Sequence, residues 1–91
     1  MGVFLVAEPN KGTAKLVSFN RNTICVKLES AGAFSVSVVD SNGNVVCLFN
    51  ESQGRQGMNS ISWNGLLIPD GRYAISIEHN GTINGVNVLL K

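Results

Sequence analysis

The sequence predicts an all-β protein, an antiparallel β-sandwich of seven to eight strands. Apolar and polar residues alternate with a period of two, and nowhere do apolar residues recur at the spacing of an amphipathic helix. Turn sequences rich in Gly and Asn separate the alternating segments at nearly regular intervals. Because a set of hairpins this short would be unstable alone, we expect two sheets packed face to face, with no helix longer than one turn.

Each alternating segment is expected to bury one of its two faces. In chain order, the predicted strands are residues 3–7, 14–19, 23–29, 34–40, 44–49, 58–63, 72–79 and 82–90. The expected structural core includes six inward-facing residues, which are Val36, Val38, Ile61, Trp63, Tyr73 and Ile75. Asn-Gly recurs between the strands because both residues tolerate the positive φ that tight hairpin turns require.

Composition places limits on domain number and on partners. Residues 1–91 are expected to form a single domain, because two cores would each be too small to fold. The net charge of +1 lacks the basic excess needed to bind nucleic acid or an anionic membrane surface. The apolar run over residues 3–7 follows no basic segment and ends at Glu8, so no signal peptide and no membrane insertion are predicted.

The two cysteines, Cys25 and Cys47, are predicted to be structural. Cys25 alternates with Ile24 and Val26, and we expect Cys47 to lie on the face opposite Val46 and Leu48, so that neither thiol points into the core. A bridge between packed sheets is therefore disfavoured, whereas a same-face pair on adjacent strands stays open. With a single histidine, the chain has too few ligands for a zinc site.

No metal, cofactor or catalytic group is predicted. Asp40 to Asn44, followed by Glu51, has the oxygen spacing of a calcium loop, but Val45 occupies the glycine position and a hairpin turn explains the segment. His79, at the end of a strand, is expected to be an exposed polar residue rather than a general base, and Asp70 is expected to form a turn. We therefore expect that the protein is not an enzyme.

Three segments occur in a distinctive order: residues 34–46, in which an alternating strand ends at Asp40, then 57–65, ending in Trp63-Asn64-Gly65, then 68–73. This order resembles the Ig-like domain of flagellar hook-capping proteins and the C-terminal sorting domains of type IX secretion cargo in Bacteroidetes, over residues 33–91. The resemblance implies an immunoglobulin-like sandwich. It also implies a non-enzymatic bacterial module for protein recognition, anchoring or sorting on an extracytoplasmic protein, secreted or at the cell surface.

Two other functions stay open. The chain could bind carbohydrate, with Trp63 as a stacking platform, although its phase with Ile61 favours burial in the core. It could also be a free-standing structural or virion protein, since it opens with Met1.

The C-terminal segment is the predicted contact surface for a protein partner. Residues 80–91 are expected to form a hairpin with residues 72–79 and to supply a closing strand, with alternate residues buried. Lys91 is its only charge, so this strand would be poorly protected against pairing with the secretion machinery, a parent-protein domain or a second copy. The residues assigned to partner binding are Val86, Val88, Leu89 and Lys91.

Overall fold

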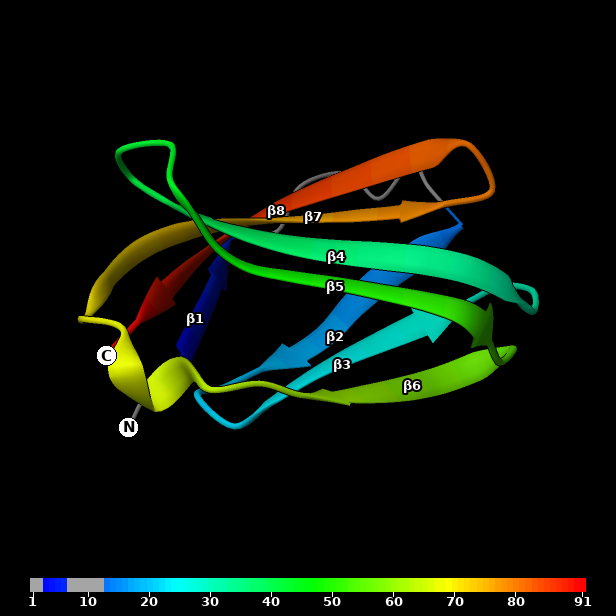
Figure 1. Cartoon of the computed structure of the whole chain (residues 1–91), viewed down its shortest axis with the longest axis horizontal. Helices are drawn as coiled ribbons and strands as arrows, with labels where there is room; N and C mark the ends of the chain where they lie inside the picture. Colours follow the sequence, from blue (N-terminus) through cyan, green and yellow to red (C-terminus); the bar gives the residue numbers. More distant parts are fainter. Residues whose placement is uncertain (1–2, 7–12) are drawn as a thin grey trace.

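The computed structural model describes the backbone of residues 3–6 and all of residues 13–91, which form a two-layer β-sandwich (Figure 1). One sheet has the strand order β1-β8-β7-β4-β5 and the other has the order β2-β3-β6. The strands are β1 (Val3–Val6), β2 (Ala14–Phe19), β3 (Thr23–Leu28), β4 (Gly32–Asp40), β5 (Val45–Gly54), β6 (Gly57–Ser62), β7 (Gly71–His79) and β8 (Thr82–Leu90). All neighbouring strands are antiparallel.

The predicted sandwich of seven to eight strands is confirmed, with eight strands in the described part of the chain. Its single helical element there is η1 (Gly65–Leu67), one 3-10 turn. Within residues 3–6 and 13–91, no helix has the length and apolar character needed to span a bilayer. Ala7, the last residue of the first predicted strand, lies outside the described residues.

The strand order is that of an immunoglobulin-like domain. With β1 set aside, β2, β3 and β6 take the places of strands A, B and E, and β8, β7, β4 and β5 take those of G, F, C and C′. Tyr73, near the start of β7, donates its hydroxyl to the carbonyl of Pro69 at 2.6 Å. A tyrosine bonded to the backbone a few residues upstream at this corner is a hallmark of the fold.

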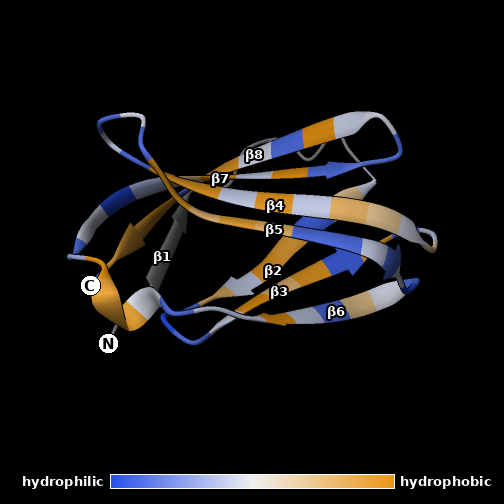
Figure 2. Ribbon diagram, viewed as in Figure 1, coloured by the Kyte–Doolittle hydropathy of each residue, from blue (hydrophilic) through white to orange (hydrophobic). Residues whose placement is uncertain are grey.

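The core lies between the two sheets and follows the predicted alternation. Hydrophobic and polar residues form stripes along the strands in Figure 2. Five of the six predicted core residues are buried, namely Val36, Val38, Ile61, Tyr73 and Ile75. Trp63 is half-buried and packs against that core, with its ring centroid 5.2 Å from that of Phe19.

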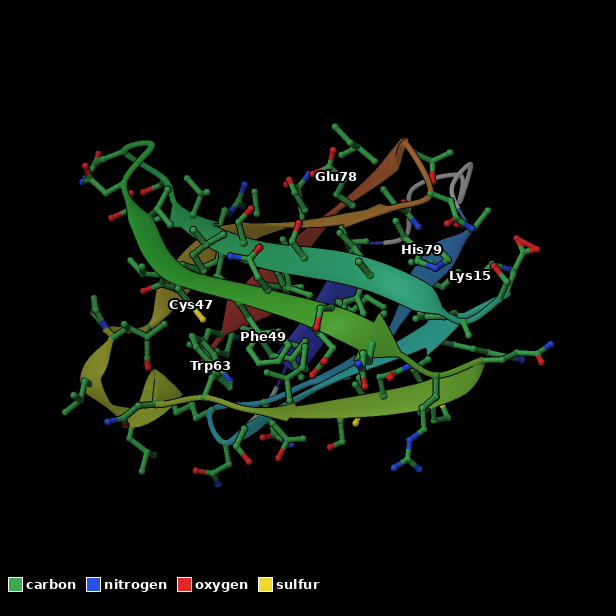
Figure 3. The ribbon with its side chains drawn as sticks, turned by 45° about the vertical axis from the view of Figure 1, so that its right-hand side comes forward. Lys15, Cys47, Phe49, Trp63, Glu78 and His79 are labelled. Carbon is green, nitrogen blue, oxygen red and sulfur yellow. The ribbon has the colours of Figure 1, made fainter. Side chains whose placement is uncertain are left out.

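The predicted orientation of β5 is wrong from Cys47 onward, whereas Val46 packs against the core as predicted. Val38 pairs with Cys47, but Val39 pairs with Val45, so Val46 is an extra residue that reverses the alternation. Cys47 and Phe49 therefore point between the sheets (Figure 3), while Leu48 is 65% exposed. Burial raises the pKa of the Cys47 thiol.

Cys25 lies on the outer face of β3, as predicted, with its Sγ 3.8 Å from the Ser60 hydroxyl. Its place there, and the inward orientation of Cys47 on the other sheet, keep the two thiols on separate sheets. Both are free.

Candidate functional site

The predicted contact strand β8 is not an open edge. It lies between β7 and β1, and Phe4 of β1 is the register partner of Leu89. The side chains of Val86 and Val88 are only 8% and 2% exposed because they face the core, so neither side chain is available to a partner. Their assignment to partner binding is wrong; Leu89 is half-buried and Lys91 is exposed.

The hairpin of β7 and β8 is confirmed, and its outer face carries a hollow of about 550 Å³. Leu89 lines this hollow beside its register partner Arg72. The other lining residues are Asp40, Ser41, Tyr73, Ala74, Asn87 and Val88. The volume falls within the range of about 300–1,000 Å³ that is typical of binding pockets. We name this feature the β7–β8 hollow.

Asp40 shapes one wall of the β7–β8 hollow through the turn that follows β4. Its Oδ1 accepts hydrogen bonds from the backbone N–H groups of Asn42 and Asn44, both at 2.9 Å. These bonds, chiefly that from Asn44, hold the pKa of the carboxyl below its usual value. The carboxylate therefore stabilises a hairpin turn, and the calcium-loop spacing is explained by this turn.

Arg72 supplies the positive charge of the hollow. It is exposed, and the ion pair found within residues 13–91 joins two other residues, Arg21 and Asp70. The Arg72 guanidinium therefore makes no ion pair within residues 13–91. The hollow combines this guanidinium with the apolar side chain of Leu89. Such a site suits a carboxylate next to an apolar group.

Arg21 holds the corner that precedes β7, a role that the sequence analysis missed. Its guanidinium donates to the carbonyls of Gly65 and Ile68, each at 2.7 Å, and pairs with Asp70. Asp70 therefore does more than form a turn. Because β7 begins directly after this corner, these bonds also fix the position of Arg72. A lone arginine in a turn between two strands carries no pattern that would reveal this contact.

His79 is buried, not exposed as predicted. It has the parity of Ile75 and Ile77 on β7, which places its ring between the sheets with 1% of its surface exposed (Figure 3). Its Nδ1 is hydrogen-bonded to the Thr13 hydroxyl, whereas Nε2 is buried with no hydrogen-bond partner among the described residues. Because the imidazole lies in the core, we interpret this hydroxyl–imidazole pair as structural.

We expect Thr13→Val to destabilise the protein by about 1–3 kcal/mol, because the substitution leaves both ring nitrogens of buried His79 without a partner. Urea unfolding monitored by circular dichroism measures the change. Thr13→Ser, which keeps the hydroxyl, is the matched control and should remain within about 1 kcal/mol of the unmodified chain. Equal destabilisation by both variants would show that this hydrogen bond contributes nothing.

The raised pKa of Tyr73 leads us to expect a loss of stability at high pH. Burial, and to a lesser extent the charge of Asp40, raises the pKa of its phenol above the ordinary value of 10.0. Above pH 10.0 the unfolded chain loses the phenol proton more readily than the folded chain does, so the free energy of unfolding falls as the pH rises. Tyr73→Phe should be less stable at pH 7 by about 1 kcal/mol and should show a shallower fall between pH 9 and 11. Parallel pH profiles of the two proteins would contradict this account.

No family model matches the chain, and no curated protein matches it either. The resemblance to hook-capping and sorting domains therefore rests on the order of the motifs around Asp40, Trp63 and Tyr73, and it stays a prediction. Within the described residues, no group of three His, Cys, Asp or Glu side chains has the geometry to hold a metal ion.

Proposed function

We propose that this chain is a non-enzymatic, immunoglobulin-like module that recognises another protein in an extracytoplasmic setting. The observation that carries the proposal is the β7–β8 hollow, in which exposed Arg72 stands beside half-buried Leu89. Recognition, anchoring and sorting can use an accessible surface of this kind, and none of them requires a catalytic group. The extracytoplasmic location in this proposal is what the motif resemblance implies.

The chemistry of the β7–β8 hollow favours a partner with an acidic side chain or a terminal carboxylate next to an apolar side chain. Arg72 can bind a carboxylate through two parallel hydrogen bonds, and Leu89 offers apolar surface to the neighbouring group. Asp40, which also lines the hollow, keeps its negative charge because its lowered pKa favours the ionised form. The two charges would orient the partner and disfavour one with reversed polarity.

The test is export of a reporter fused to the complete chain in a bacterium competent for type IX secretion. Residues 33–91 would be too short, because β6 pairs with β3 and that fragment lacks both β2 and β3. We expect the fusion to be exported and Arg72→Glu to abolish export. Arg55→Glu, an equal charge change at an exposed site outside the hollow, should leave export intact.

Failure of the unmodified fusion to be exported would reject sorting. Equal export of both variants would reject the β7–β8 hollow as the recognition surface. In either case the fold would stand, since circular dichroism of the purified chain reports on it separately.

The structure gives Trp63 a role other than stacking on sugar. Its Nε1 donates to the carbonyl of Asn20 at 2.6 Å, and its ring packs against Phe19. A glycan titration that shifted the fluorescence of Trp63 would contradict this role and would favour carbohydrate binding over protein recognition.

A further inference from the structure

The free edge of β5 is a second surface, separate from the β7–β8 hollow. β5 is one of the two outer strands of the five-stranded sheet (Figure 1), and among residues 3–6 and 13–91 no strand pairs with it on the side away from β4. Alternate residues of an edge strand direct their backbone N–H and C=O groups outward, where they form a template for another strand.

Register shifts at both ends limit this edge to a short regular segment. On the N-terminal side of Cys47, the extra residue Val46 displaces the pairing with β4. On the C-terminal side of Glu51, an additional residue of β5 does the same. Such bulges twist an edge and end regular pairing. The segment open to another strand is therefore residues 47–51, which we call the β5 window.

The β5 window lacks the usual protection against pairing. It contains no Lys, Arg or Pro, and Glu51 is its single charge. Leu48 projects from its outer face with 65% of its surface exposed. The edge strand β2 differs, because it carries exposed Lys15 and an irregular register between Leu16 and Ser18. Of these two edges, the β5 window is the less defended.

We propose that the β5 window pairs antiparallel with the β5 window of a second copy of this chain, about a two-fold axis at Phe49. In this register Leu48 lies opposite Asn50 of the second copy, and Cys47 lies opposite its Glu51. The two Glu51 carboxylates are then at opposite ends of the window, so no like charges meet. The two Leu48 side chains become diagonal neighbours, about 7–8 Å apart, on the outer face.

A second copy suits this edge because the register sets no like charges opposite each other and brings the two exposed Leu48 side chains near one another. A strand paired antiparallel with itself about its central residue keeps every side chain on its own face of the sheet. The contact is therefore isologous, and it closes after two copies. The bulges at either end prevent a longer overlap.

The dimer should be weak and reversible. Five residues a side bury less than the roughly 1,200 Å² of a standard stable interface. We therefore expect a dissociation constant between about 1 μM and about 1 mM. This proposal does not depend on the β7–β8 hollow, so a failed export test would leave it intact.

Sedimentation velocity of the complete chain from about 10 μM to about 1 mM tests the proposal, with two matched variants. Leu48→Lys places a charge within the β5 window. Ile83→Lys places the same charge on β8, an interior strand, at a site with equal exposure, 66% against 65%. The unmodified chain and Ile83→Lys should dimerise alike, and Leu48→Lys should raise the dissociation constant at least tenfold. Circular dichroism verifies that each variant is folded.

A chain that stays monomeric at about 1 mM would overturn the proposal, as would equal dimerisation of both variants. Amide hydrogen exchange locates the contact. On concentration, protection should increase within residues 47–51, and an increase confined to another strand would assign the dimer to that strand instead.

Discussion

Gly54→Ala is expected to destabilise the protein by about 3 kcal/mol, a large part of the roughly 5–15 kcal/mol that keeps a small domain folded. A Cβ atom at Gly54 would lie 2.5 Å from the carbonyl oxygen of Gly32 and 2.7 Å from side-chain carbons of Leu28 and Phe34. The backbone oxygen cannot move aside, because Gly32 and Gly54 are register partners in β4 and β5. Urea unfolding measures the loss.

Gly85→Ala is the matched control. Gly85 lies within β8, and a Cβ atom there would meet nothing within 4 Å. Its replacement should leave the stability unchanged or increase it by about 0.4–1 kcal/mol, since alanine restricts the unfolded chain. Similar losses at both positions would show that the close approach at Gly54 is not what requires glycine.

Trp63→Ala should destabilise the protein by about 3 kcal/mol. The indole packs on Phe19 and donates to the carbonyl of Asn20, so it joins the end of β6 to the turn between β2 and β3. Its removal leaves a cavity at the corner and a carbonyl without its partner. Unfolding must be monitored by circular dichroism, because the variant lacks the single tryptophan.

Trp63→Phe separates the two contributions of the indole. The phenyl ring keeps much of the contact with Phe19 but cannot donate a hydrogen bond. We expect it to recover more than half of the loss, because packing contributes more than one neutral hydrogen bond. An unchanged unfolding midpoint in Trp63→Ala would contradict the corner role and restore Trp63 as a candidate sugar platform.

Periodicity in the sequence predicts most of the fold because each strand has one buried face. The alternation in β3, β4 and β7 predicts the buried side chains of Ile24, Val36 and Ile75. The same rule fails at Cys47, since one bulged residue reverses the faces and leaves no trace in the alternation itself. His79 is misplaced for another reason. Its polarity suggests exposure, although the parity of β7 buries it.

The candidate site was less predictable because it depends on strand order. The pattern of β8 shows which residues face the core, but the pairing of β1 with β8 joins the two ends of the chain, and local patterns carry no signal for it. Leu89 was predicted as a contact residue, whereas the adjacent Arg72 was not. The register of the β7–β8 hairpin brings Arg72 and Leu89 together, so their proximity can be predicted only when that register is known.

The central claim is that β5 is an open edge of the larger sheet and that the C-terminal strand β8 is not. Residue-resolved amide hydrogen exchange of the dilute monomeric chain tests it most directly, because an interior strand protects consecutive amides while an edge strand protects alternate ones. We predict slow exchange at consecutive amides of β8 and β7, and alternating slow and fast exchange over residues 47–51. Alternating exchange along β8, with uniform protection over residues 47–51, would contradict the claim.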